Sequence, residues 1–297
     1  MKSKKTTVSL VLGSGGARGL SHIGVIHYLE EHGYEITSVA GSSMGALVGG
    51  IYAAGKLKNY TEWVRAITKL DILRLLDISL VGGGFVKGDR IIGTLRQLIG
   101  DQLIENLPIS FTAVASNIVK EKEVWLSKGS LFDAIRASIA IPLFFTPFEL
   151  NGEELLDGGI LNPVPIAPTF KDNTDLTIAV NLGGHPDEAY QQSEEEDEEP
   201  STLSLIQRTI KNFIDGIQDG KTQKSQIKLD MYDVINQSLD AMQGAIARQK
   251  LAAYPPDVLI DIPRNICGTL EFDRADEIIH YGYRRAVEVL SASVEKK

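Results

Sequence analysis

The first 55 residues contain two consecutive units in which a β-rich segment runs into a glycine-rich turn and then into a helical pattern. The first segment, Thr6–Leu12, leads into Gly13–Gly19, after which apolar residues recur at helical spacing as far as Gly33. The second segment, Ile36–Ala40, leads into Gly41–Gly45 and a helix rich in small residues. Repeated units of this kind build a parallel or mixed sheet covered by helices, so we expect an α/β fold.

Later segments extend this pattern towards the C-terminus. Asn151-Gly152 separates Phe148–Leu150 from Glu153–Leu156 and is typical of a type I′ hairpin turn, because both residues tolerate positive φ. Hydrophobic periodicity and turn residues predict further strands at 110–115, 123–126, 175–182 and 257–262, and helices at 59–72, 91–99, 206–217, 231–246 and 275–290.

The charge of the chain is unevenly distributed. Eight of the carboxylates behind the net charge of −9 lie between residues 187 and 199, and the rest of the chain carries a net charge of −1. Because no basic stripe is present, nucleic acid is not expected as a partner. We expect a catalytic core at 1–184, an acidic mobile loop at 185–202, and a helical extension with a late strand and helix at 203–297 that packs on the same domain.

Several other classes of protein are disfavoured. The single Cys267 has no partner for an internal disulfide or a thiolate metal site, which favours a reducing, cytoplasmic location. The apolar run Val8–Leu12 is too short for a signal peptide. Ile36–Gly55 is uncharged for 20 residues but contains five glycines, so a buried strand, turn and helix explains it better than a membrane span.

A nucleophile is indicated where Gly41-Ser42-Ser43-Met44-Gly45 matches G-x-S-x-G. A strand enters this motif and a helix leaves it, which is the context that presents a serine above a sheet. Flanking Gly41 and Gly45 permit the tight turn, and Ser43 occupies the centre of the motif. The alternative interpretation is a turn that is merely rich in small residues.

The glycine loop Gly13–Gly19 is the expected anion-binding element. Backbone N–H groups of Gly15, Gly16 and their neighbours could bind an oxyanion, with Arg18 nearby. A dinucleotide fingerprint is disfavoured because Arg18 stands at the sixth position of G-x-G-x-x-G, where glycine is required.

Two groups could activate the serine. A triad of Ser43, Asp157 and His280 has the chain order of an α/β-hydrolase. His280, however, lies within a continuous helical pattern, which favours a surface position. Asp157 follows a hairpin and precedes Gly158 and Gly159, which let another backbone approach closely, and it is the favoured base.

Three elements in order resemble the patatin-like phospholipases, and within them the bacterial branch related to neuropathy target esterase. They are the glycine loop Gly13–Gly19, the motif around Ser43 and Asp157-Gly158-Gly159. The segment Ala134–Pro142 also looks like the one that these proteins place before the Asp-Gly element. The resemblance implies a three-layer α/β/α fold with a mostly parallel central sheet. It also implies a catalytic dyad of Ser43 and Asp157. Ser14 stands where the family's loop often begins with Gly.

The resemblance further assigns roles within the glycine loop. It implies that Gly15, Gly16 and Ala17 form an oxyanion hole, while Arg18, Gly13 and Gly19 contribute to anion or substrate binding. The implied activity is hydrolysis of lipid carboxylic esters, as in phospholipase A or lysophospholipase, through an acyl-enzyme and without metal or cofactor.

The expected partners are a lipid or fatty acyl ester and, peripherally, the inner face of the membrane. An acyltransferase and a non-catalytic lipid-binding protein are the alternatives. Leu143–Phe148 and the segment 63–80 are candidate walls for an acyl chain, although most apolar runs are plain core, and Gly82–Phe85 is a candidate lid hinge.

Overall fold

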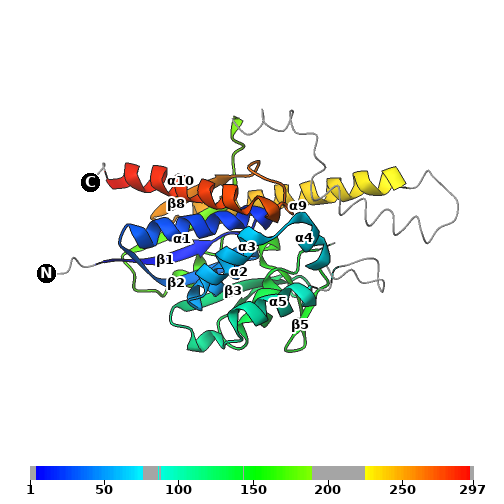
Figure 1. Ribbon diagram of the computed structural model, residues 1–297, viewed down its shortest axis with the longest axis horizontal. Helices are drawn as coiled ribbons and strands as arrows, with labels where there is room; N and C mark the ends of the chain where they lie inside the picture. Colours follow the sequence, from blue (N-terminus) through cyan, green and yellow to red (C-terminus); the bar gives the residue numbers. More distant parts are fainter. Residues whose placement is uncertain (1–4, 76–85, 87, 143, 189–224, 295–297) are drawn as a thin grey trace.

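The computed structural model describes residues 5–75, 86, 88–142, 144–188 and 225–294 (Figure 1). Its strands form one sheet in the order β5-β6-β3-β2-β1-β7-β8, with β4 also paired to β3. Strands β3, β2, β1, β7 and β8 run parallel to their neighbours in that order, whereas β4, β5 and β6 form antiparallel pairs. The strands are β1 Thr6–Leu12, β2 Tyr34–Ser42, β3 Ser110–Asn117, β4 Lys122–Leu126, β5 Phe148–Leu150, β6 Glu153–Asp157, β7 Leu176–Gly184 and β8 Val258–Pro263.

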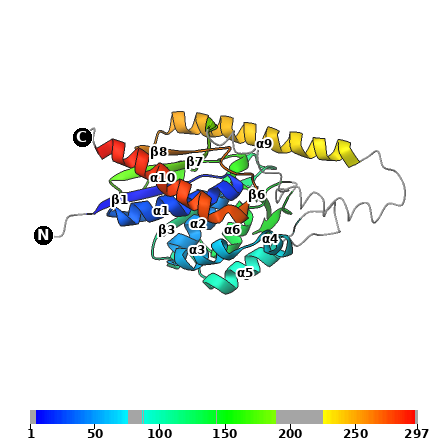
Figure 2. The same cartoon turned by 45° about the horizontal axis from the view of Figure 1, so that its top comes forward.

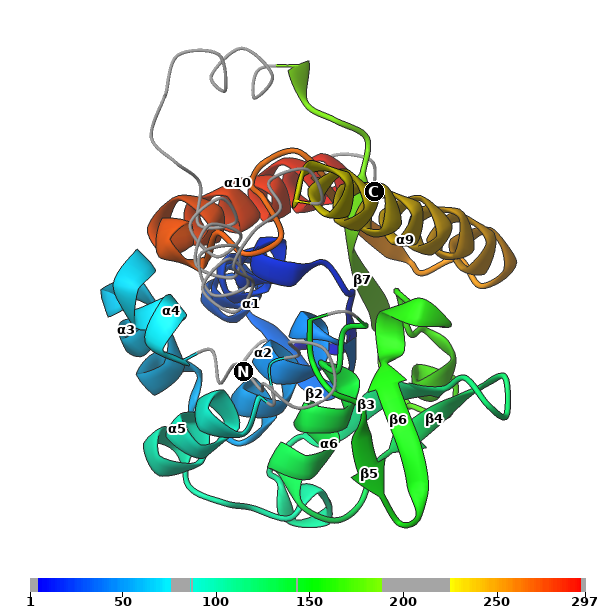
Figure 3. The same ribbon diagram turned by 90° about the vertical axis from the view of Figure 1, so that its right-hand side faces the viewer.

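Helices cover both faces of this sheet (Figures 2 and 3). They are α1 Ser21–Glu31, α2 Met44–Ala53, α3 Leu57–Ala66, α4 Lys69–Leu75, α5 Asp89–Ile99, α6 Leu131–Ser138, α9 Ser225–Ala253 and α10 Ala275–Val294. Short 3₁₀ helices are η1 Gly16–Leu20, η2 Ile104–Asn106, η3 Gly158–Ile160, η4 Ala167–Thr169 and η5 Phe272–Arg274.

The alternation of side chains along β1 explains why helices cover both faces of the sheet and form three layers with it. Leu10 and Leu12 belong to the large core that α1, α2 and α10 share, whereas Val11 packs in a smaller cluster with Ala247 of α9. Because successive strand side chains point to opposite faces, both faces of β1 must be covered. Figure 3 shows α1 and α2 on one side of the sheet and α9 on the other. The expected α/β/α architecture is therefore confirmed.

The expected single helix across 59–72 is instead two helices, and that expectation was wrong. The chain is extended at Ile67 between α3 and α4. Thr68 then starts α4, because its N–H donates to Asp71 Oδ2 at 3.1 Å while Asp71 N–H donates to Thr68 Oγ1 at 3.3 Å. This reciprocal capping box begins a new helix.

Close packing of α1 against α10 joins the two ends of the chain. A Cβ on Gly24 would lie 2.0 Å from the carbonyl oxygen of Ile279, and one on Gly282 would lie 2.0 Å from that of Ser21. Glycine is therefore required at both positions. This contact holds α10 against the segment that follows the glycine loop.

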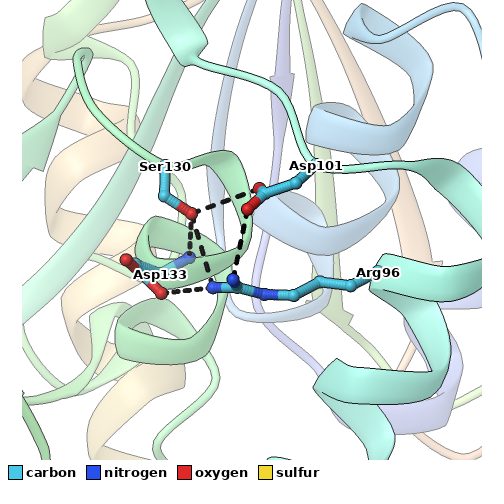
Figure 4. Close-up of polar contacts among 4 residues, drawn as sticks. All are labelled: Arg96, Asp101, Ser130 and Asp133. Carbon is cyan, nitrogen blue, oxygen red and sulfur yellow. Dashed lines mark hydrogen bonds and ion pairs between the residues drawn. The ribbon is translucent and has the colours of Figure 1, made fainter.

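A polar network joins α5 to the start of α6 (Figure 4). Arg96 donates to Asp133 at 2.5 Å and to Asp101 at 3.2 Å, and it also reaches Ser130 at 3.4 Å. Ser130 is the N-cap of α6 and accepts from the N–H of Asp133. The network fixes α6, which carries a residue that supports the site described below.

Most of the expected elements are confirmed within the described residues. The hairpin turn is one example, since Asn151 and Gly152 both have positive φ. The first helix, α1, begins at Ser21, one residue after the first position of the expected helical pattern, because Leu20 belongs to the 3₁₀ helix η1. The expected helix at 206–217, the hinge at Gly82–Phe85 and all but 185–188 of the acidic loop lie outside the described residues. No helix among the described residues is long and apolar enough to cross a membrane.

Candidate active site

Ser43 occupies a sharp turn between β2 and α2. Its φ of 54° and ψ of −122° are unusual for a residue with a side chain. The turn is tight because a Cβ on Gly41 would lie 2.3 Å from the carbonyl oxygen of Gly45, and one on Gly45 would lie 2.0 Å from that of Leu12. The two glycines of the motif thus allow the backbone of α2 to pack directly on the sheet.

The sheet brings Asp157 to the same level as Ser43. Strand β3 lies between β2 and β6, and its neighbouring residues Val114 and Ala115 pair with Ser42 and Asp157 respectively. Ser43 and Asp157 therefore meet at the end of the sheet where the parallel strands terminate. Both residues are only 1% exposed.

The glycines after Asp157 are needed for close backbone contacts. A Cβ on Gly158 would lie 2.0 Å from the carbonyl oxygen of Val114, and one on Gly159 would lie 2.4 Å from Ser14 Oγ. Ser14, which departs from the usual glycine at the start of the loop, thus packs directly against Gly159. Asp157-Gly158-Gly159 therefore contacts both β3 and the glycine loop.

Burial changes the acidity of Asp157. Desolvation raises the pKa of its carboxyl from 3.8 to about 7, although the Ser43 hydroxyl and the Gly159 N–H both oppose this increase. Gly159 N–H donates to Asp157 Oδ1 at 2.7 Å, which fixes the orientation of the carboxylate. A carboxyl with a pKa near neutrality is suited to general base catalysis.

One side-chain oxygen of Ser43 and one of Asp157 lack a hydrogen-bond partner among the described residues. Ser43 Oγ and Asp157 Oδ2 are buried, and neither makes a hydrogen bond within the described part of the chain. The Ser43 hydroxyl is nevertheless close enough to lower the carboxyl pKa. The two groups are therefore neighbours in a contact that is looser than a hydrogen bond, as is common in unliganded catalytic sites.

Two other serines hold the turn around Ser43. The N–H of Ser43 donates to Ser138 Oγ at 2.9 Å, and that hydroxyl in turn donates to the carbonyl of Val114 at 2.6 Å. Ser42 Oγ donates to the carbonyl of Asn162 at 2.7 Å. Ser42 is thus occupied structurally, which agrees with the choice of Ser43 as the nucleophile.

The backbone hydrogen bonds of the glycine loop divide its N–H groups into two sets. Those of Gly13, Ser14 and Ala17 donate to carbonyls of Val180, Pro163 and Thr269 at 2.8–3.0 Å. Across the described residues no hydrogen bond engages the N–H groups of Gly15 and Gly16. These two remain available to an oxyanion, whereas the expected donor Ala17 already has a partner.

Met44 offers a donor that the sequence interpretation missed. It is the first residue of α2, where N–H groups have no carbonyl partner within the helix. The N–H that follows the nucleophile commonly contributes to an oxyanion hole. The G-x-S-x-G motif itself was the signal that could have identified it.

The remaining loop residues serve the loop's structure. A Cβ on Gly13 would lie 2.8 Å from the carbonyl oxygen of Val180, and one on Gly19 would lie 2.3 Å from the Cβ of Met44. Arg18 is buried, and its Nε donates to the carbonyl of Gly15 at 3.0 Å. This geometry gives no support to the expectation that Gly13, Arg18 and Gly19 bind the substrate.

His22 and His280 lie in different environments. His22 is completely buried, and its Nε2 lies 2.9 Å from the carbonyl oxygen of Gly13. Desolvation lowers the pKa of His22 to about 4, although the Gly13 carbonyl opposes this decrease, so the ring is neutral at pH 7 and donates to that carbonyl. His280 is exposed on α10, whereas Ser43 and Asp157 are buried, and this geometry does not support the triad.

Replacing His280 with Ala is expected to leave ester hydrolysis intact, because its exposed side chain is not in the site. We expect kcat/KM within about twofold of the wild-type value for a short-chain chromogenic ester. Loss of activity in His280→Ala with unchanged thermal unfolding would instead support the triad of Ser43, Asp157 and His280.

An apolar cavity opens beside Ser43. Its cavity volume is about 90 Å³, and its walls are almost entirely apolar. Gly16 and Ser43 line one part of it. The other walls come from α2 to α5, from the segment after α6, and from residues near η5: Met44, Leu47, Tyr60, Trp63, Val64, Ile67, Ile72, Leu75, Ile91, Leu95, Ile139, Ile141, Phe144, Phe145, Thr269, Leu270 and Phe272.

Both expected acyl-chain walls contribute described residues to this cavity. Phe144 and Phe145 come from the first wall, and Trp63 and Ile72 are examples from the second. Thr269 and Leu270 were not expected. No feature of the C-terminal sequence pointed to them, because only the fold brings that loop against Gly16.

Comparison with known proteins agrees with this architecture. The patatin-like phospholipase family model matches residues 10–170. An uncharacterized NTE family protein of Mycobacterium tuberculosis is 39% identical over 98% of this chain and 93% of its own length. Lysophospholipase NTE1 of Saccharomyces cerevisiae is 27% identical over 93% of this chain, which spans only 16% of that larger protein. VipD from Legionella pneumophila matches in structure with a TM-score of 0.50 and 17% identity, over 98% of this chain and 67% of that chain.

The mixed sheet with helices on both faces and a serine turn after β2 is the patatin fold. This chain belongs to the patatin-like phospholipase family, and its near full-length similarity to NTE family proteins places it in that branch. Membership of this family implies a hydrolase that acts on lipid esters.

Proposed function

We propose that this protein is a serine lipid acyl hydrolase of the phospholipase A or lysophospholipase type, with Ser43 as nucleophile and Asp157 as base. One observation carries the proposal. A buried serine in a sharp strand-to-helix turn lies beside a carboxyl with a pKa of about 7, next to an apolar cavity. The similarity to fungal proteins that are named lysophospholipases gives the proposed substrate class a second, weaker support.

Acyl transfer to the enzyme is the first half of the reaction. Asp157 accepts the proton of the Ser43 hydroxyl while Oγ attacks the carbonyl carbon of the ester. The tetrahedral intermediate then collapses, the bond to the alcohol breaks, and the proton on Asp157 passes to the departing alcohol oxygen. Ser43 now carries the acyl chain as an ester.

Hydrolysis of that ester is the second half. Asp157 accepts a proton from a water molecule, which attacks the acyl carbon, and the proton then returns to Ser43 Oγ as the fatty acid leaves. One base therefore serves both halves. No metal or cofactor takes part in either step.

The oxyanion that forms in both halves needs aligned donors. We assign this role to the N–H groups of Gly15 and Gly16, with that of Met44 as a third donor. Each well-aligned donor is worth about 3 kcal/mol of transition-state stabilisation. The N–H groups of Gly15 and Gly16 are supported as donors because neither has a carbonyl partner among the described residues. That of Met44 is supported by its position in the first turn of α2.

The apolar cavity is the proposed site for the acyl chain. Apart from Ser43, its lining offers few polar side chains, such as Tyr60 and Thr269, so a lipid head group would stay outside it. Peripheral contact with the inner face of a membrane and a cytoplasmic location remain predictions.

Hydrolysis of a series of esters tests the proposed function. We expect kcat/KM for monomeric p-nitrophenyl esters to rise from two to about eight or ten acyl carbons, since each buried CH₂ contributes about 0.8 kcal/mol. Lysophospholipids are assayed in parallel, with Ser43→Ala as the blank. A maximum of kcat/KM at acetate or butyrate would contradict the lipid substrate class and indicate a general esterase.

The alternatives give distinct outcomes in the same assay. An acyltransferase would form a new ester when an acceptor alcohol such as glycerol is added, at the expense of free fatty acid. A non-catalytic lipid-binding protein would retain a lipid without any acyl adduct on Ser43 by mass spectrometry. Either result would contradict the hydrolase assignment.

A further inference from the structure

Arg18 makes an unusual set of contacts for a charged residue beside a catalytic serine. Its side chain is 8% exposed, and the guanidinium donates to three backbone carbonyls. Nε bonds to Gly15 at 3.0 Å, while Nη1 reaches Leu182 at 3.4 Å and Arg264 at 3.3 Å. The side chain thus joins the glycine loop to the end of β7 and to the loop after β8.

The bond to Gly15 fixes the direction of a neighbouring group. The carbonyl of Gly15 and the N–H of Gly16 belong to one peptide unit, and in a trans peptide they point in opposite directions. Because the carbonyl points to Arg18, the N–H points away from it. Gly16 and Ser43 line the same cavity, so an N–H of Gly16 that points away from Arg18 has the side of Ser43 open to it.

We propose that Arg18 is a positioning residue that aims the Gly16 N–H at the oxyanion, rather than a binding group for the substrate. The inference rests on the proposed function, since it concerns the oxyanion of that reaction. Gly16 has a φ of +58°, which leaves its peptide unit dependent on such external bonds for its orientation.

The helix α9 completes the surroundings of Arg18. Asp240 Oδ1 lies 3.8 Å from Arg18 Nη2, and the Asp240 side chain is 57% exposed. A second cavity, lined by Ser14, Arg18, Asp240 and Gln243 among others, lies on this side of the glycine loop. Arg18 therefore shares a cavity with residues of α9, whereas Gly16 and Ser43 line a different cavity.

A lysine cannot replace this arrangement. Arginine presents five donors in a rigid planar fork, whereas lysine has a single compact ammonium group. Lysine would keep the positive charge near the loop but would lose the simultaneous bonds to Gly15, Leu182 and Arg264. Arg18→Lys therefore separates a role of charge from a role of position.

The test measures steady-state kinetics on a soluble short-chain ester for wild type, Arg18→Lys and Arg18→Gln. We expect kcat to fall by 10- to 100-fold in both variants while KM changes by less than twofold, because a misaimed donor affects only the transition state. The rate of Ser43 modification by a fluorophosphonate should fall by the same factor, since that reaction also develops charge on an oxygen. Arg264→Lys is the matched control and should keep the wild-type kcat, because Arg264 contributes its backbone carbonyl.

Other results would overturn the inference. A wild-type kcat in Arg18→Lys would show that charge alone suffices, and a rise in KM with constant kcat would show that Arg18 binds substrate. Thermal unfolding of each variant at the assay temperature identifies loss through unfolding. Arg18→Ala with guanidinium ion at tens of millimolar then provides a second measurement, in which recovery of kcat supports the inference and its absence contradicts it. Failure of the proposed function is distinguishable, because wild type itself would then neither hydrolyse the ester nor react with the fluorophosphonate.

Discussion

Ser43→Ala is expected to lower kcat for ester hydrolysis by about 10⁴-fold or more, because it removes the only atom proposed to form the acyl-enzyme. Labelling by a fluorophosphonate should disappear completely. The measurement is the initial rate on a chromogenic ester at pH 8, together with mass spectrometry of the labelled protein.

Ser42→Ala is the matched control for this prediction. It removes the same atom one residue earlier, where the hydroxyl is buried and donates to the carbonyl of Asn162. We expect a loss of about 1 kcal/mol of stability but a kcat within a few-fold of wild type. Full fluorophosphonate labelling of Ser43→Ala, or its loss only in Ser42→Ala, would place the nucleophile elsewhere.

The backbone at Ser43 offers an independent check. Its positive φ costs about 1–3 kcal/mol for a residue with a Cβ, and glycine carries no such cost. Ser43→Gly should therefore be inactive yet more stable than Ser43→Ala, with a higher midpoint of thermal unfolding. Strain retained at this one residue would be consistent with a serine kept for its chemistry.

The part of the fold that sequence predicts best is the part governed by local patterns. β1 has the expected bounds Thr6–Leu12 because its β-rich segment ends at a glycine loop, and the Asn151-Gly152 turn follows from backbone preferences alone. The break between α3 and α4 was missed, since the apolar spacing continues through it and only the capping pair Thr68 and Asp71 marks it.

In the site, too, sequence predicts the residues that lie in local motifs but not the contacts that depend on distant parts of the chain. Motifs pointed to Ser43 and Asp157 because each is surrounded by glycines that only a close backbone approach requires. The direction of Arg18 and the use of the Ala17 N–H could not be predicted, since both depend on partners more than 160 residues away, at Leu182 and Thr269. Such contacts are set by how β7 and the C-terminal loop pack, which short motifs do not encode.

Asp157→Asn is expected to abolish hydrolysis nearly as completely as Ser43→Ala, since an amide cannot accept the serine proton. In the wild type, kcat/KM should rise about tenfold per pH unit below pH 7 and level off above it, because only the ionised carboxylate is a base and its pKa is about 7. A profile that is flat between pH 5 and 8 would contradict the role of Asp157.

Asp157→Asn should also raise the free energy of unfolding, because the buried carboxyl of the wild type destabilises the folded state when it ionises. The carboxyl has a pKa of about 7 in the folded protein against an ordinary value of 3.8, so between pH 4 and 7 the folded state holds a proton that the unfolded state releases. Raising the pH through this window therefore destabilises the wild type, by at most about 4 kcal/mol above pH 7. The amide introduced by Asp157→Asn carries no charge at any of these pH values and escapes this cost.

We expect the midpoint of thermal unfolding of Asp157→Asn to exceed that of wild type by roughly 5 °C at pH 8, and the difference to shrink steadily towards pH 4. Glu154→Gln on the same strand is the control, because it removes a carboxylate that is exposed and should change neither the midpoint nor its pH dependence. A variant less stable than wild type at pH 8 would mean that the ionised carboxylate is stabilised by its surroundings. The site would then lack the poorly solvated base on which the proposed chemistry depends.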